Sequence, residues 1–266
     1  MLIAKSNDCP RCGTGHANSC FVTYHNGWHC FSCGASYVTD KDSYSFRPSQ
    51  TVNTNIYLPQ NIITNYSQFS LGTIEWLYKF GVYKEFIQQH HIGYVPFEEF
   101  VTKHNLRYSG ESLIFPIINN NEIVYYQRRF FPNKQILTVG NANALFIARK
   151  GVQNSRTIVI VEDYISAIRV GQIHHCMCLF GTKLKALQLS YILENYTNIK
   201  VWLDGDAPGQ DSAKKIRKQL YDTIKYKCAQ LAFKQQIYSI ENIFTEKDPK
   251  YYTNTEICTI LNKNRE

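Results

Sequence analysis

Two short apolar segments that each end in acidic residues constrain the fold of this chain most strongly. Thr157–Val161 is rich in β-branched side chains, as is typical of a buried strand, and Glu162 and Asp163 follow it directly. Ile199–Leu203 is a second such segment, and it ends in Asp204–Asp206. Because each segment has its acids at its carboxyl end, we expect these acids to meet at one edge of one sheet.

Helical patterns follow both predicted strands. Tyr164–Val170 and Asp211–Lys225 carry apolar residues at close to helical spacing, and Cys176–Phe180 between them has the composition of a third strand. Strands that alternate with helices are typical of an α/β fold with a mostly parallel sheet, whose ligands bind at the carboxyl ends of the strands. The C-terminal part of the chain is therefore predicted to be α/β.

The acids Glu162, Asp204 and Asp206 are predicted to bind a metal ion. Asp204 and Asp206 are two residues apart and so lie on one side of the chain, where carboxylates repel one another unless a cation holds them. Mg²⁺ or Mn²⁺ is the natural cation, because such hard ions take carboxylates and leave positions for phosphate oxygens. Asp248 is a fourth predicted ligand. An isolated Asp-Gly-Asp is more often a surface turn, but its position after a buried strand favours the metal site.

The nine cysteines include two CxxC pairs. Their spacing lets two turns present four thiolates tetrahedrally to one structural Zn²⁺, and a redox pair or chance is the alternative. Residues Phe21–His29 between the pairs turn at Asn26-Gly27, a strong hairpin signal. Residues 1–38 are therefore predicted to form a β zinc ribbon with the ligands Cys9, Cys12, Cys30 and Cys33.

The rest of the chain is predicted to divide into three parts. Residues 39–56 are rich in Ser, Thr, Asn and Asp and predict a linker, although a surface loop between packed domains is the alternative. Residues 57–154 predict a mixed α+β segment, in which Thr73–His90 has the pattern of two helices. Residues 155–266 form the α/β unit.

A predicted hairpin in the middle segment ends in basic residues. Ser112–Ile118 and Glu122–Gln127 are its strands, and Arg128 and Arg129 come at its far end. Adjacent residues of a strand point to opposite faces, so one arginine can hold phosphate in a groove while the other faces solvent or an acid. Lys134 follows after a turn. Exposed basic strand ends are common, which is the alternative explanation.

The composition is compatible with an intracellular protein that binds a polyanion such as nucleic acid. Lys and Arg number 29 against 21 Asp and Glu, a formal charge of +8 that is spread along the chain. No apolar run approaches the roughly 18–20 residues of a membrane span, and the start has no apolar region of a signal peptide. We therefore expect no membrane association, and a cytoplasmic location.

Several of these features together resemble one family. The Glu162 element, Asp204-Gly205-Asp206 and Lys247-Asp248-Pro249 look like the Toprim domain that primases, topoisomerases and some nucleases share. The order of zinc ribbon, linker, hairpin with Phe115-Pro116 and Gln127-Arg128, then Toprim domain resembles bacterial and bacteriophage DNA primases over nearly the whole chain.

The resemblance implies a DNA primase, which makes short RNA primers on single-stranded DNA from ribonucleoside triphosphates. It implies that the ribbon helps to select the template and that residues 57–154 are the basic N-terminal subdomain of the polymerase core. Glu162, Asp204, Asp206 and Asp248 would bind the catalytic metal, and Arg128 and Lys134 would line the basic side of the cleft.

The sequence departs from the family pattern at two positions. Asp163 stands where the family usually has Gly, and Ser166 stands where it usually has Asp. No GxxxxGK[ST] phosphate loop is present, so a replicative helicase is expected to be a separate protein, in a host cytoplasm if a phage encodes the chain. A Toprim nuclease or recombination protein, and a weakly catalytic zinc-ribbon protein that binds single-stranded DNA, remain as alternatives.

Overall fold

The computed structural model describes residues 56–262 except 103–104, 141–143, 150–154 and 230–236, together with the backbone of four short strands before residue 56. These strands form an antiparallel sheet in the order β1-β2-β3-β4. β2 pairs with β3 from Phe21 opposite Cys30 to Tyr24 opposite Gly27, so the predicted hairpin is confirmed and Gly27 already belongs to its second strand. The four strands are β1 (Leu2–Ala4), β2 (Phe21–Tyr24), β3 (Gly27–Cys30) and β4 (Ser36–Val38).

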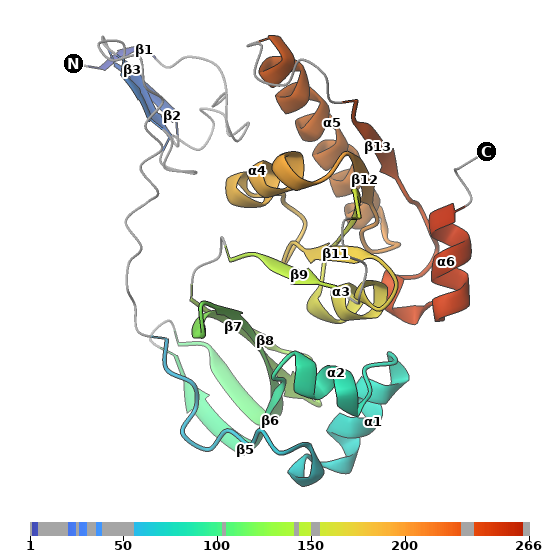
Figure 1. Cartoon of the computed structure of the whole chain (residues 1–266). Coiled ribbons are helices and arrows are strands. Elements are labelled where there is room, and N and C mark those ends of the chain that lie inside the picture. Colours follow the sequence, from blue (N-terminus) through green and yellow to red (C-terminus); the bar gives the residue numbers. More distant parts are fainter. Residues whose placement is uncertain are drawn as a thin grey trace.

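A four-stranded antiparallel sheet in the order β5-β6-β7-β8 follows, together with two helices (Figure 1). The predicted helix pair and the predicted hairpin are both confirmed, and the hairpin strands are longer than expected. Gly81 lies between the helices with φ +67, a conformation that glycine adopts easily. The elements are α1 (Leu71–Lys79), α2 (Lys84–Gln89), β5 (Gly93–Val101), β6 (Arg107–Asn119), β7 (Glu122–Phe131) and β8 (Ile136–Gly140).

The second sheet has five strands in the order β13-β12-β10-β11-β9, and four of them are parallel. The predicted α/β fold is confirmed. β10 has the predicted bounds, and successive strand residues alternate between the two faces of the sheet. The strands are β9 (Phe146–Ala148), β10 (Thr157–Val161), β11 (His175–Cys178), β12 (Asn198–Val201) and β13 (Ser239–Asn242).

Helices cover both faces of this sheet. α3 and α6 pack on the face that carries Val159 and Trp202, and α4 and α5 pack on the face that carries Ile158 and Ile160. This arrangement is the layered structure that alternating strands and helices favour. The helices are α3 (Tyr164–Gly171), α4 (Ala186–Asn195), α5 (Ala207–Ala229) and α6 (Asn254–Asn262).

β9 belongs to the second sheet although it precedes the expected boundary at residue 155. It pairs antiparallel with β11, Met177 lying opposite Ile147. A Cβ on Gly171 of α3 would lie 2.3 Å from the Ala148 Cβ, so α3 packs tightly on this edge strand. Residues before the expected boundary at 155 therefore supply one edge strand of the sheet of the 155–266 unit.

The two sheets share one hydrophobic core, with α3 on the side of the five-stranded sheet that faces the antiparallel sheet (Figure 1). Tyr164 of α3 is 2% exposed and stacks on Phe146, with ring centroids 4.1 Å apart. Its ring also lies 5.0 Å from that of Phe115 in β6, and its hydroxyl donates to the Pro116 carbonyl oxygen. Tyr164 thus joins the sheet that carries the acids to the sheet that carries the arginines.

His90 lies at this junction and is predicted to make stability depend on pH. Its ring packs edge-on against Phe146 and Tyr164. Burial, and to a lesser extent the charge of His91, lower the pKa of His90 from 6.5 to about 4. The unfolded chain therefore binds this proton more readily, and the free energy of unfolding should decrease as the pH falls from about 6.5 towards 4.

Thermal unfolding between pH 7 and pH 4.5 should show a smaller decrease in His90→Phe than in the wild type. His91→Asn is the matched control, since His91 is exposed and has φ 51, which asparagine tolerates. Equal decreases in the wild type and His90→Phe would contradict the prediction.

Among the helices that the structure describes, none is both long and apolar enough to cross a membrane.

Candidate active site at the carboxyl ends of the parallel strands

The parallel strands deliver the predicted acids to one edge of the five-stranded sheet. β10 leads into Glu162, β12 leads through Trp202 into Asp204, and Asp248 lies in the segment after β13. The Trp202 amide donates to the Ile160 carbonyl, so the pairing of β12 with β10 continues almost to the acids. The structure therefore brings together the acids that the sequence placed at strand ends.

Gly205 allows the Asp-Gly-Asp turn to lie directly against the segment after β13. Its amide donates to Asp248 Oδ1 at 3.3 Å. A Cβ on Gly205 would lie only 2.7 Å from the carbonyl oxygens of Thr245 and Glu246. Because backbone oxygens cannot move aside easily, any larger residue would push Asp248 away from Asp204.

Gly205→Ala is accordingly expected to lower the free energy of unfolding by about 1–3 kcal/mol, the usual cost of overpacking. Urea unfolding in EDTA would measure the change. Gly72→Ala is the control, because a Cβ there meets only Glu111 Oε1 at 3.9 Å and alanine suits the first turn of α1. An equally stable Gly205→Ala protein would show that the turn is free to shift.

Asp206 lies at the start of α5. Its Oδ1 accepts a hydrogen bond from the Gly209 amide at 2.8 Å, and its carbonyl accepts one from Gln210. The side chain is exposed, in contrast to that of Asp204. The same turn therefore presents one half-buried carboxylate, with Oδ1 buried, and one exposed carboxylate.

Asp163 and Ser166, the two departures from the family pattern, bind one another. Asp163 caps α3, accepting hydrogen bonds from the Ile165 and Ser166 amides at 2.9 and 3.0 Å. The Ser166 hydroxyl donates to Asp163 Oδ2 at 2.7 Å. The fifth acid of this edge is thus held by the first turn of α3.

Lys250 is the basic residue of the cluster, and the sequence prediction missed it. Its Nζ lies 3.1 Å from Asp163 Oδ2 and 2.9 Å from Asp248 Oδ2. Burial alone lowers the pKa of Lys250, but the charge of Asp163 and the hydrogen bond with Asp248 outweigh burial and raise it. Its position two residues after Asp248, across a proline, was the only signal for it in the sequence.

Asp204 is the least satisfied acid of the cluster. Its Oδ1 is buried and has no hydrogen-bond partner. Burial raises the pKa of Asp204 from 3.8 to about 7, although Lys250 opposes the shift. Burial, with the charges of Asp163 and Asp206, also raises the pKa of Glu162. At both carboxyl groups, burial and the neighbouring acids therefore outweigh the opposing charge of Lys250.

These properties fit a divalent cation. The site offers hard oxygen donors, an orphaned buried carboxylate oxygen and an excess of negative charge. In the parts of the chain that the structure describes, no three His, Cys, Asp or Glu side chains are already gathered at ligand distance around one point. The residue types fit the cation, and binding would have to draw them together.

The structure separates the two adjacent arginines of β7. Arg128 is 3% exposed, and its guanidinium donates to Ser112 Oγ at 2.7 Å and to Glu98 Oε2 at 2.6 Å. It also lies 4.6 Å from the centre of the Phe130 ring. These contacts place Arg128, which was predicted to bind phosphate, in the interior with its guanidinium already paired.

Arg129 points to the opposite face. Its guanidinium lies 4.7 Å from the centre of the Trp76 ring, and its Nε is buried without a partner. Burial lowers the pKa of Arg129, while the charge of Asp163 raises it, so the side chain lies within electrostatic reach of the acidic cluster. Lys134 is exposed in the turn before β8. The alternation of strand faces predicted this separation but not which arginine faces the acids.

The predicted zinc ligands Cys9, Cys12 and Cys33 lie outside the described residues. For Cys30 the structure describes the backbone, at the end of β3. The zinc site therefore stays a prediction.

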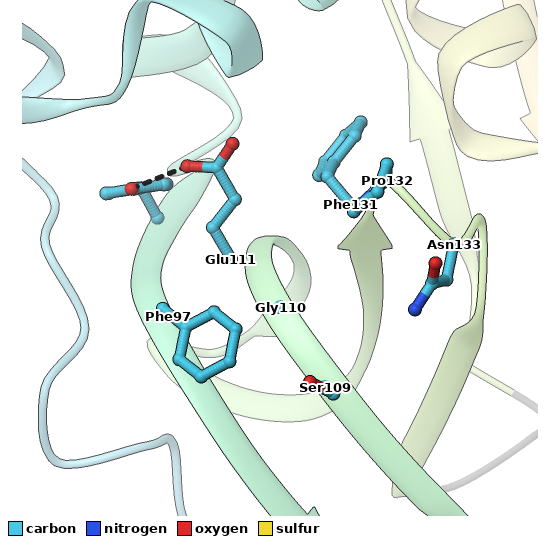
Figure 2. Close-up of a pocket in the computed structure, with 8 residues that line it drawn as sticks. Phe97, Ser109, Gly110, Glu111, Phe131, Pro132 and Asn133 are labelled. Atoms are coloured by element: carbon cyan, nitrogen blue, oxygen red, sulfur yellow. Dashed lines mark hydrogen bonds between the residues drawn. The ribbon is translucent and has the colours of Figure 1, made fainter.

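A pocket of about 460 Å³ lies in the antiparallel sheet, away from the acids. Figure 2 shows Phe97, Glu111 and Asn133 around it, and the Tyr94 hydroxyl donates to Glu111 Oε2 at 2.8 Å. None of the clustered carboxylates lines it. The chemistry argued from the acids therefore does not involve this pocket.

Comparisons with known proteins agree with this geometry. The family described as Toprim-like matches residues 159–240, which include Glu162, Asp204 and Asp206. The zinc-binding and RNA polymerase domains of the Aquifex aeolicus primase are similar in structure, with a TM-score of 0.56 and 13% identity over 73% of this chain and 56% of that chain. This chain thus spans little more than half the length of the Aquifex chain.

Two further solved structures are similar over about three quarters of both chains. The DnaG catalytic core has a TM-score of 0.55 and 15% identity, and covers 74% of each chain. The DnaG primase catalytic domain bound to single-stranded DNA has a TM-score of 0.55 and 14% identity, covering 75% of this chain and 76% of that one. No curated protein matches the sequence. At these identities the likeness establishes the fold.

Proposed function

We propose that this protein is a DNA primase. It carries a Toprim-like domain, and its fold is similar to that of the bacterial primase cores. It would synthesise short RNA primers on single-stranded DNA by metal-dependent nucleotidyl transfer. The observation that carries the proposal is Asp204: a carboxylate with a buried, unpartnered oxygen, at the strand ends, beside Glu162. A structural acid would have a partner for that oxygen.

In the proposed reaction the acids bind the metal ion and accept a proton. Glu162, Asp204, Asp206 and Asp248 would hold Mg²⁺ or Mn²⁺, which when bound supplies the charge that stabilises phosphate oxygens. The primer 3′-hydroxyl attacks the α-phosphorus of a ribonucleoside triphosphate, and pyrophosphate leaves. Glu162, at the end of β10, is proposed either to bind the metal or to accept the proton of that hydroxyl.

Basic residues would bind the anionic substrates opposite the acids. We assign Arg129 to phosphate, because its guanidinium lies over the Trp76 ring within electrostatic reach of Asp163, and its Nε has no hydrogen-bond partner. Lys134, exposed in its turn, would contact the template or the nucleotide. Arg128 supports Arg129 from the interior rather than binding phosphate itself.

The N-terminal part would bind template. Cys9, Cys12, Cys30 and Cys33 are proposed to hold a structural Zn²⁺, and residues 39–56 to link this ribbon to the polymerase core formed by the 57–154 and 155–266 subdomains. A replicative helicase would act as a separate partner. This function would place the protein with replicating DNA in the cytoplasm, that of a host cell if a phage encodes it.

Primer synthesis tests the proposal directly. The full chain is incubated with mixed-sequence single-stranded DNA, labelled ribonucleotides and Mg²⁺ or Mn²⁺. Short RNA that requires both the template and the metal is expected, and Cys30→Ser should reduce template-dependent synthesis. Asp211→Asn is the control for the acids, since Asp211 is exposed on α5 and pairs only with Lys214 among the described residues.

Other outcomes of this assay would support one of the alternative functions instead. Shortening of the DNA would indicate a Toprim nuclease, which uses the same acids. DNA binding without any RNA would indicate a single-stranded-DNA-binding replication factor. Arg129 favours the primase over both, because a polymerase must bind triphosphate as well as DNA and Arg129 is the arginine of β7 that we assign to phosphate.

A further inference from the structure

Lys250 is held inside the acidic cluster by several contacts. Its side chain is 17% exposed, and its ammonium group bridges Asp163 of the β10–α3 turn and Asp248 of the segment after β13. The ammonium also lies 5.6 Å from the centre of the Tyr251 ring. Pro249 lies between Asp248 and Lys250 and is buried. It begins the short 3₁₀ helix that fixes the backbone of Lys250.

The position of the ammonium group matters because of the charges around it. Five carboxylates surround this edge of the sheet: Glu162, Asp163, Asp204, Asp206 and Asp248. Lys250 contacts two of them and influences Asp204 and Glu162 through space. Asp163, in turn, is fully occupied by the α3 amides, Ser166 and Lys250. The cluster is therefore divided into a side that Lys250 contacts directly and a side that it reaches only through space.

We propose that Lys250 is a tethered cation that occupies the Asp163–Asp248 side of the cluster, so that the site takes one divalent cation, at Glu162, Asp204 and Asp206, rather than two. Lys250 is a positioning residue in this scheme: it holds Asp248 and Asp163 together before any metal binds. Asp248, whose Oδ1 accepts from the Gly205 amide and whose Oδ2 pairs with Lys250, then helps to hold the Asp-Gly-Asp turn in place. The inference rests on the proposed function, since it concerns the metal that the function requires.

The number of bound metal ions tests the inference without reference to activity. Mn²⁺ titrations of the full chain, followed by electron paramagnetic resonance, should give one ion per wild-type molecule. Lys250→Met removes the charge, keeps an unbranched side chain that is one atom shorter, and should give two ions. Lys250→Arg should restore a single ion, because it restores the positive charge.

Stability in the absence of metal gives a second readout. In EDTA, Lys250→Met should unfold about 5–10 °C below the wild type, because a largely buried ion pair loses one partner. Excess Mg²⁺ should recover most of that difference. Lys247→Met is the matched control: Lys247 is exposed on the same segment, and its replacement should change neither the Mn²⁺ count nor the melting temperature.

The outcomes separate the inference from the proposed function. Two Mn²⁺ ions on the wild type, or one ion on both the wild type and Lys250→Met, would overturn the inference and leave the metal-dependent function standing. No Mn²⁺ on any of the proteins would overturn both. An unchanged melting temperature of Lys250→Met in EDTA would overturn the claim that Lys250 neutralises the cluster.

Discussion

Asp204→Asn is expected to reduce RNA synthesis by about 10²–10³-fold, the order of loss that follows removal of one preorganised electrostatic contact at a reacting centre. Asparagine has nearly the same shape, so the turn should survive. Asparagine lacks the negative charge that aspartate has at Oδ1, the oxygen that has no hydrogen-bond partner in the fold. Primer synthesis under saturating template and nucleotide would measure the loss.

The same substitution is expected to stabilise the metal-free protein above neutral pH. The pKa of Asp204 is about 7 in the folded state against 3.8 ordinarily, so the folded state resists its ionisation. The stability that this group contributes is present below pH 3.8 and is lost as the pH rises through about 7. Asp204→Asn should not lose this stability as the pH rises. Melting temperatures of the wild type and of Asp204→Asn, measured in EDTA at pH 5 and pH 8, would show the difference.

Asp211→Asn, on the solvated face of α5, is the control for both measurements and should leave synthesis and stability unchanged. A fully active Asp204→Asn protein would remove the central residue from the proposed site. A variant that is inactive but also less stable in EDTA at pH 8 would show that Asp204 is a structural residue.

Arg128→Met is expected to lower the free energy of unfolding by about 2–4 kcal/mol, the cost of breaking a buried, hydrogen-bonded charge pair from one side. The substitution leaves Ser112 Oγ and Glu98 without the guanidinium that they bind. Urea unfolding would measure the loss. Arg107→Met is the control, because Arg107 pairs with Glu99 on the surface, where ion pairs contribute little.

The neighbouring Arg129→Gln should behave in the opposite way. Its Nε has no partner to lose, so stability should change little, while the KM for ribonucleoside triphosphate should rise about tenfold or more, since a charge-assisted phosphate contact disappears. The two adjacent variants therefore separate stability from substrate binding. A large loss of stability in Arg129→Gln with unchanged KM would contradict the assignment of Arg129 to phosphate.

Short-range patterns in the sequence predicted the elements well. The β-branched run predicted β10 with its observed bounds, and the helical spacing after it predicted α3 to within one residue. The Asn-Gly pair predicted the β2–β3 hairpin. Each of these depends on interactions between residues close in sequence, so the local composition suffices.

The strand-end acids could be placed at one edge of the sheet for a similar reason. Parallel strands end on the same side, so Glu162 and Asp204 had to meet once both segments were identified as strands. The pattern did not show which oxygen would remain unpartnered, since that depends on how closely Gly205 packs against the Thr245–Glu246 backbone.

Local sequence by itself therefore determined the α/β class, the strand that carries each acid and the pairing of arginines on opposite faces of β7. The tertiary structure decided that Arg128 is buried, that Arg129 faces the acids, and that Lys250 reaches Asp163, which is 87 residues away in the chain. The physical reason is the distance along the chain over which each interaction acts. Periodicity reflects which face of one element is apolar, whereas charge neutralisation depends on distances between elements that only the packed core sets.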